Sequence, residues 1–298
     1  MTSTVAPAVR PDPATMRLRD GRQLAWYEFG DPDGVPCLYM PGTPESGLAG
    51  GCYDRAAAEG GVRWIAVDRP GYGHSDFAPG RTLRDWPDDV AQLADHLGVG
   101  RFAVVGESGG GPHALALGFV LADRLTTLVL LAAMGPGHER WVRKGMRRSN
   151  VMFFWLSRCV PVTLRLPLGV MRRASMSPRL AARMEATGPP ADRRATADPE
   201  YRLRLDAVPD AFRQGTRAAA QELALFARPW GFGLADVATP AHLWHGTEDV
   251  NVPLAVARAV GRALPEVHEH IVDGAAHTVG FERRRDVMQA IVEAGERA

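Results

Sequence analysis

The stretch that decides the fold spans residues 102 to 112 and reads Phe102-Ala103-Val104-Val105-Gly106-Glu107-Ser108-Gly109-Gly110-Gly111-Pro112. Its first four residues are apolar, which predicts a buried strand, and proline at 112 is typical of the first turn of a helix. A strand that becomes a helix within about three residues brings the two backbones close together, so positions 106 and 110 favour glycine, which has no Cβ. We therefore predict a sharp turn that holds the Ser108 hydroxyl at a sheet edge, beside the free N–H groups of a helix start.

Apolar strands alternate with helical patterns on both sides of this turn. We predict strands at 37–40, 62–67, 127–132, 241–245 and 267–272, and helices at 86–97, 253–263 and 283–294. A β-hairpin around Asp20-Gly21, with strands at 16–19 and 23–29, precedes them. Unbroken apolar strands that alternate with helices indicate a mostly parallel sheet with helices on both faces. Ligands of such sheets bind at the carboxyl ends of the strands, so we expect the functional residues in the loops that follow strands.

Between about residue 135 and residue 235 the strand patterns disappear. Helical patterns near 140–157, 178–187 and 206–227 predict an inserted helical cap, or lid, at 135–235. The remaining parts are a flexible N-terminal tail at 1–15 and a core made of 16–134 and 236–298. The cap contains 18 Lys and Arg and 8 Asp and Glu, whereas the rest of the chain contains 17 and 26. One explanation is that the two parts attract each other, or that the arginines solvate helix faces. The other is that the basic cap attracts an anionic substrate or an acyl chain on a carrier.

The overall composition is that of a globular enzyme. With 298 residues, 46% hydrophobic and 23% charged, disordered and fibrous classes are excluded. The three cysteines have no redox or metal-ligand spacing, the first 14 residues have no apolar run, and arginines and prolines interrupt the apolar segment 151–171. We therefore expect a cytoplasmic protein without a membrane span. We expect neither a metal nor another cofactor, because no ligand cluster is present and the glycines after Gly106 lack the lysine of a phosphate loop. No nucleic-acid partner is expected, and the oligomeric state stays open.

The loops after later strands supply the partners that a serine nucleophile needs. A serine hydroxyl reacts only when a base takes its proton and an acid orients that base. Asp249 follows the strand at 241–245 and His277 follows the strand at 267–272, which gives the order Ser108, Asp249, His277. Two plainer interpretations stay open: Asp249 as an acid at the start of the next helix, with Glu248 as a competing acid, and His277 as a surface histidine.

Four motifs, which follow one another along the chain in the order typical of the family, resemble those of the α/β-hydrolase fold family. The resemblance covers nearly the whole chain from about Met16. In chain order they are Asp68-Arg69-Pro70-Gly71-Tyr72-Gly73-His74-Ser75, Gly106-Glu107-Ser108-Gly109-Gly110, Gly246-Thr247-Glu248-Asp249 with Val252-Pro253, and Gly274-Ala275-Ala276-His277. The resemblance implies an α/β-hydrolase fold with an inserted cap and the triad Ser108, Asp249 and His277. Serine at the nucleophile position argues against the epoxide hydrolase and haloalkane dehalogenase branches, which use aspartate there.

The oxyanion loop departs from the family pattern. It usually begins His-Gly, but here it reads Pro41-Gly42-Thr43-Pro44. Backbone N–H groups stabilise the oxyanion, so the change of side chain leaves the donors in place. By position, the donors are the amides of Thr43 and Gly109.

The predicted function is that of a serine hydrolase. We expect it to cleave a carboxylic ester, a thioester or a lactone of a largely apolar small molecule through an acyl-enzyme on Ser108. Four aromatic residues of the cap are candidates for the substrate pocket, although helical caps also need a core of their own: Trp141, Phe153, Phe154 and Trp155. Glu107, beside the nucleophile, either packs and hydrogen-bonds near the turn or tunes the site electrostatically. Two alternatives remain: a lyase, cyclase or carbon–carbon bond hydrolase of secondary metabolism that uses the same pocket, and a receptor-like ligand-binding protein with an idle triad.

Overall fold

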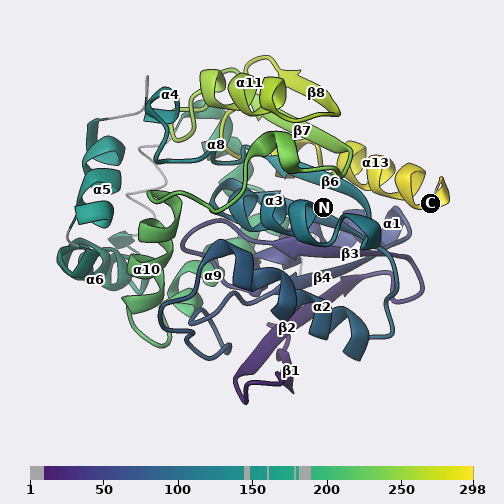
Figure 1. The fold of residues 1–298 in the computed structure, drawn as a ribbon, viewed down its shortest axis with the longest axis horizontal. Coiled ribbons are helices and arrows are strands. Elements are labelled where there is room, and N and C mark those ends of the chain that lie inside the picture. Colours follow the sequence, from purple (N-terminus) through teal and green to yellow (C-terminus); the bar gives the residue numbers. More distant parts are fainter. Residues whose placement is uncertain (1–9, 144–147, 160, 178, 181–188, 298) are drawn as a thin grey trace, which may run out of the picture.

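The fold is built on one eight-stranded sheet with the strand order β1-β2-β4-β3-β5-β6-β7-β8 (Figure 1). The computed structural model describes residues 10–143, 148–159, 161–177, 179–180 and 189–297. Strands β3 to β8 run parallel, whereas β2 is antiparallel to β4 and to β1. The strands are β1 (Ala14–Arg17), β2 (Gln23–Gly30), β3 (Val35–Met40), β4 (Val62–Val67), β5 (Phe102–Glu107), β6 (Leu125–Leu131), β7 (Ala241–Gly246) and β8 (Val267–Val272). The predicted α/β fold with a mostly parallel sheet is confirmed.

Both faces of the sheet are covered, which explains why its central strands are apolar without alternation. Successive side chains of a strand point to opposite faces. Leu38 and Val104 therefore pack with α2 (Trp86–His96), α3 (Gly111–Val120) and α11 (Leu254–Ala263). Their neighbours Tyr39 and Val105 pack on the other face, with α1 (Asp54–Glu59) and α13 (Arg284–Glu296).

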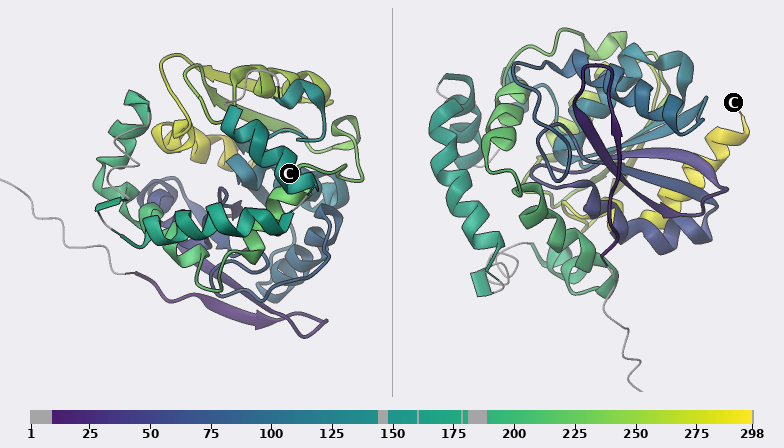
Figure 2. Two further views of the ribbon diagram at one scale, coloured as in Figure 1. Left: turned by 90° about the vertical axis from the view of Figure 1, so that its left-hand side faces the viewer. Right: turned by 90° about the horizontal axis from the view of Figure 1, so that it is seen from below.

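The segment between β6 and β7 is helical in its described parts, and we call it the β6–β7 segment. Its elements are α4 (Arg140–Arg143), α5 (Arg148–Cys159), η5 (Pro161–Leu164), α6 (Arg165–Ser175), α8 (Pro190–Thr196), η6 (Pro199–Tyr201), α9 (Arg202–Ala211), α10 (Arg217–Phe226) and η7 (Leu234–Asp236). Helices α5 and α6 pack on α10 and stand apart from the sheet (Figures 1 and 2). Whether this segment is a separate cap domain stays a prediction.

Two helix predictions for this segment need comment. The single helix expected over 206–227 is wrong, because the chain forms α9 and α10 there. Between them Gly215 has a φ of +95°, which a right-handed helix does not accommodate. The helix expected at 178–187 lies almost wholly outside the described residues.

Elsewhere the predicted elements agree with the structure to within a few residues. The hairpin forms, but its first strand is Ala14–Arg17 rather than 16–19. Short elements without an apolar pattern escaped prediction: the 3-10 helix η1 (Gly47–Tyr53) and helix α1. In the described part of the chain, every helix is too short or too polar to cross a membrane.

Candidate active site

Ser108 lies in the sharp turn between β5 and α3, at the carboxyl edge of the sheet. Its φ is +51°, in the left-handed region that non-glycine residues rarely adopt. The flanking glycines permit the close approach: a Cβ on Gly106 would lie 2.5 Å from Cβ of Ala114, and one on Gly110 would lie 2.0 Å from the carbonyl oxygen of Met40. The turn therefore fixes the serine side chain relative to both β3 and α3.

The loops after β7 and β8 bring an acid and a histidine to the serine. The His277 Nε2 atom lies 3.0 Å from Oγ of Ser108, and its Nδ1 atom lies 2.8 Å from Oδ2 of Asp249. The other carboxylate oxygen of Asp249 accepts hydrogen bonds from the backbone N–H groups of Asn251 and Val252. Both oxygens of Asp249 are thus engaged, and the carboxylate is fixed in position.

The charges of Asp249 and His277 influence each other's pKa. Burial disfavours the ionised Asp249 carboxyl, but the charge and hydrogen bond of His277 outweigh burial and hold the pKa of Asp249 below its usual range. Burial likewise disfavours a protonated His277, but Asp249 outweighs it and raises the pKa of His277 to about 9. Asp249 therefore stabilises an imidazolium at position 277, which is the form that a base adopts after it takes a proton.

The backbone of Thr43 lies close to Gly109, the residue after Ser108. Thr43 lies in the loop after β3, and a Cβ built on Gly109 would meet its N atom at 3.2 Å and its Oγ1 atom at 2.1 Å. Gly109 is the second residue of the 3-10 turn η3 (Ser108–Gly110), where the N–H group has no partner within the helix. The two amides predicted as oxyanion donors are thus neighbours beside Ser108.

Residues 38–283 match the α/β hydrolase fold family. The chain belongs to this family. A solved α/β hydrolase fold protein from Nakamurella multipartita superposes with a TM-score of 0.68 at 23% identity, covering 95% of this chain and all of that one. An esterase from Exiguobacterium antarcticum superposes with a TM-score of 0.67 at 17% identity, covering 96% of this chain and all of that one. In sequence, a proline iminopeptidase from Neisseria gonorrhoeae is 29% identical over 142 residues, which are 46% of this chain and 45% of that protein. The match thus spans less than half the length of this curated relative.

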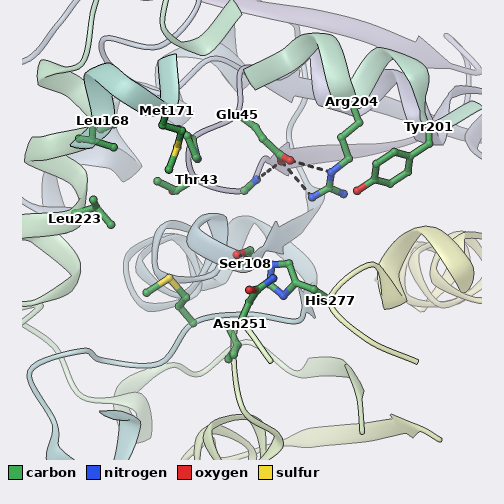
Figure 3. A pocket seen from close by; sticks show the side chains of 15 residues that line it. Thr43, Glu45, Ser108, Leu168, Met171, Tyr201, Arg204, Leu223, Asn251 and His277 are labelled. Atoms are coloured by element: carbon green, nitrogen blue, oxygen red, sulfur yellow. Dashed lines mark hydrogen bonds and ion pairs between the residues drawn. The ribbon is translucent and has the colours of Figure 1, made fainter. Parts of the chain in front are cut away.

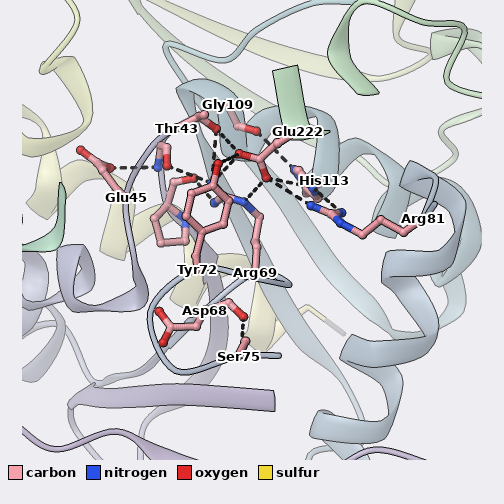
Figure 4. Close-up of polar contacts among 12 residues, drawn as sticks. Thr43, Glu45, Asp68, Arg69, Tyr72, Ser75, Arg81, Gly109, His113 and Glu222 are labelled. Atoms are coloured by element: carbon pink, nitrogen blue, oxygen red, sulfur yellow. Dashed lines mark hydrogen bonds and ion pairs between the residues drawn. The ribbon is translucent and has the colours of Figure 1, made fainter. Parts of the chain in front are cut away.

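The loop that departs from the family pattern is held by a buried network around Glu222 of α10 (Figure 4). Glu222 accepts hydrogen bonds from Arg69 Nε at 2.7 Å, Tyr72 OH at 2.7 Å and Thr43 Oγ1 at 2.6 Å. Arg69 also donates to the carbonyl oxygens of Pro41 and Gly42. Burial alone would raise the pKa of Glu222, but its cationic neighbours, Arg69 foremost, lower it to about 2. We call these residues the Glu222 network; an ionised glutamate and an arginine thus fix the loop that begins with proline here.

A second contact joins the β6–β7 segment to the same loop. Arg204 of α9 donates from Nη1 to Glu107 Oε1 at 2.5 Å and from Nε and Nη2 to the two carboxylate oxygens of Glu45. Glu45 in turn accepts the backbone N–H of Gly42. Glu107 also accepts hydrogen bonds from Tyr39 and Tyr53 and is fully buried. The hydrogen-bonding interpretation of Glu107 therefore agrees with its surroundings. We call Arg204, Glu45 and Glu107 the Arg204 bridge.

A cavity of about 420 Å³ opens above Ser108 and has two chemically different sides (Figure 3). Leu168 and Met171 of α6 and Leu223 of α10 line one side. Tyr201 and Arg204 lie on the other side, and Ser108 lies between the two groups. The cavity can thus accept a molecule that is apolar at one end and polar at the other.

Of the four aromatic residues predicted for the pocket, the two whose side chains are described, Trp141 and Trp155, do not line it. The side chain of Trp155 is 63% exposed, and Trp141 packs against the core instead of lining the cavity. The side chains of Phe153 and Phe154 lie outside the described part of the structure. The prediction was wrong for Trp141 and Trp155, because aromatic composition does not reveal which face of a helix turns inward. On α6, Leu168 and Met171 line the cavity.

The remaining candidates occupy supporting positions. Glu248, the competing acid, is exposed, and its backbone N–H donates to Ala275. His245 is buried and contacts the carbonyl oxygen of Val252 through Nε2, which supports the loop of Asp249. Among the described residues no group of three or more histidine, cysteine or acidic side chains is arranged to hold a metal ion.

Proposed function

We propose that this protein is a serine hydrolase that cleaves carboxylic esters or thioesters, lactones included, through an acyl-enzyme on Ser108. One observation carries the proposal: the continuous hydrogen-bond chain from Asp249 Oδ2 through His277 to Ser108 Oγ, at 2.8 and 3.0 Å, beside a cavity. Such a chain couples an alcohol to a base and the base to a carboxylate, which is what nucleophilic catalysis by serine needs.

The reaction follows from the positions of these groups. Ser108 Oγ attacks the substrate carbonyl carbon while His277 Nε2 takes the hydroxyl proton. The backbone N–H groups of Thr43 and Gly109 donate to the oxygen that becomes negative. His277 then returns the proton to the leaving alcohol or thiol, and the acyl group remains on Ser108. A water molecule that gives its proton to His277 releases the acid and restores the serine.

The cavity suggests the kind of substrate. We propose that the apolar part of the substrate lies against Leu168, Met171 and Leu223, and that a polar group lies toward Tyr201 and Arg204. The Arg204 bridge combines two carboxylates with one guanidinium, so it offers no uncompensated positive charge to an anion. Neutral substrates with a polar substituent, rather than strongly anionic ones, therefore fit this side of the cavity.

Active-site labelling tests the proposal. A fluorophosphonate probe is expected to form one adduct on Ser108, located by mass spectrometry, and Ser108→Ala is expected to remain unlabelled. On p-nitrophenyl esters of increasing acyl length, Ser108→Ala and His277→Ala should lose a factor of about 10⁴ or more in kcat. Absence of the adduct on folded protein would contradict the proposal. Labelling without turnover of esters, thioesters or lactones would favour the lyase or the ligand-binding alternative.

A further inference from the structure

Helices α5 and α6 present an apolar outer face that no described residue covers. On α5, Met152 and Trp155 are 55% and 63% exposed; on α6, Leu166 and Val170 are 79% and 67% exposed. Val162, in η5 between the helices, is 59% exposed. Both helices pack on α10 (Figure 2), and the five side chains are exposed to solvent. Singly exposed apolar residues are ordinary, but a group of this size usually marks an interaction surface.

The same face is positively charged. Arg158 is three residues after Trp155, and Arg173 is three residues after Val170, so each arginine shares a helix face with the apolar residue before it. Both arginines are exposed, as is Arg165. Between Glu139 and Glu185 the chain contains eleven Lys and Arg and no Asp or Glu. We call these three arginines and the five apolar residues the outer face.

This combination selects among possible partners. A second copy of the chain placed face to face would bring two sets of arginines together without an acid between them, which disfavours self-association. An acidic carrier protein would pair with the arginines but would have to supply an apolar patch as well. An anionic lipid surface offers both features at matching depths, with phosphates for the arginines and hydrocarbon just below them.

We propose that the outer face docks on an anionic lipid bilayer, with Trp155, Leu166 and Val170 inserted below the headgroups. The docked helix α6 would then connect the lipid to the cavity, because its inward residues Leu168 and Met171 line the space above Ser108. The proposal concerns binding and does not depend on hydrolysis. It can therefore be tested with Ser108→Ala, and its failure would leave the proposed function untouched.

The test measures binding of the Ser108→Ala protein to vesicles by flotation. Binding is expected to vesicles of phosphatidylcholine mixed with phosphatidylglycerol, and not to phosphatidylcholine alone. It should weaken between about 0.1 M and about 1 M NaCl, because the screening length falls from about 10 Å to about 3 Å. Trp155 provides a local signal, since five of the other six tryptophans are buried and Trp141 is half-buried. Its fluorescence should shift to the blue on binding, and Trp155→Phe should bind without that shift.

Variants locate the surface. Arg158→Gln with Arg165→Gln should reduce partitioning about 25-fold, which is about fivefold for each arginine. Trp155→Ser with Leu166→Ser should abolish vesicle binding. The same pair of changes in the protein that retains Ser108 should leave hydrolysis of a soluble short ester unchanged. The matched control is Arg19→Gln with Arg285→Gln, which removes two exposed arginines outside the β6–β7 segment. It should bind normally. Absence of vesicle binding, binding without the fluorescence shift, dimer formation that needs Trp155, or binding of an acidic carrier protein but not of vesicles would each overturn the proposal.

Discussion

At the scale of single residues, the protonation state of His277 is the property that the surrounding charges affect most directly. Asp249 raises the pKa of His277 to about 9, so the imidazole is mostly protonated at neutral pH. A base must be neutral to accept the proton of Ser108. In the free enzyme the reactive form therefore becomes more abundant as the pH rises toward 9.

The first prediction follows from the raised pKa of His277. The value of kcat/KM should rise with pH, with a midpoint near the pKa of about 9. In Asp249→Asn the raising charge is gone, so the midpoint should move down toward the ordinary histidine value of about 6.5. The maximal rate should fall by about 10³ to 10⁴, because an amide neither orients nor stabilises the imidazolium as a carboxylate does. The pH profile of a neutral ester measures both effects, and an unshifted midpoint in the variant would contradict the prediction.

The contact among Ser108, Asp249 and His277 could be predicted from sequence because each residue lies within a short local pattern. Ser108 stands between glycines, and Asp249 and His277 directly follow apolar strands. The partnership of Arg69 with Glu222 has no such pattern. The two residues are 153 positions apart, and their contact depends on how α10 packs, which periodicity does not encode.

At the scale of elements, the turn between β5 and α3 depends on the absence of a Cβ at position 110. An added Cβ there would lie 2.0 Å from the backbone oxygen of Met40 and 2.6 Å from that of Pro41. Neither contact can be relieved by turning a side chain. The loop after β3 and the start of α3 would have to move apart.

The second prediction concerns this packing. Gly110→Ala should destabilise the protein by about 2 kcal/mol or more, because the clash is with backbone. Gly100→Ala is the matched control, since a Cβ at position 100 meets no heavy atom within 4 Å, and it should change stability by less than about 1 kcal/mol. Urea denaturation of both variants measures the difference, and equal midpoints would refute the packing argument.

Sequence patterns predicted the strands more accurately than the helices of the β6–β7 segment. A buried strand is a short apolar run bounded by turn residues, and β4 has the bounds that were predicted, Val62–Val67. The break between α9 and α10 depends on one glycine conformation at residue 215. Helical periodicity on both sides of that glycine gave no sign of it.

At the scale of the whole molecule, the β6–β7 segment and the sheet share the loop of residues 41–45. The Glu222 network holds this loop through Arg69 and Thr43, and the Arg204 bridge holds it through Glu45. The Arg69–Glu222 pair is fully buried, whereas Glu45 and Arg204 lie at the wall of the cavity. Removing one partner of the buried Arg69–Glu222 pair leaves the other charge without compensation in the protein interior.

The third prediction tests this connection. Glu222→Gln should destabilise the protein by about 3 to 5 kcal/mol, because Arg69 loses its counter-charge. Under conditions where the variant is still folded, kcat should fall about tenfold to a hundredfold with little change in KM, since a displaced loop weakens the oxyanion donor more than it weakens substrate binding.

Thr43→Val is the matched control for this variant, because it removes the hydroxyl contact to Glu222 but keeps the backbone N–H and the ion pair with Arg69. Its loss of kcat should be smaller. Steady-state kinetics together with thermal unfolding separate the two effects. A loss of stability in Glu222→Gln with kcat unchanged would mean that the network supports folding alone.

The shared loop also bears on protein engineering. Replacing the helices above Ser108 with those of another hydrolase would remove Glu222 and Arg204 together. Arg69, Glu45 and Glu107 would then remain in the chimera without their partners of opposite charge. A replacement for the β6–β7 segment therefore has to contain a glutamate and an arginine at the equivalent positions. Otherwise Arg69, Glu45 and Glu107 must be substituted at the same time.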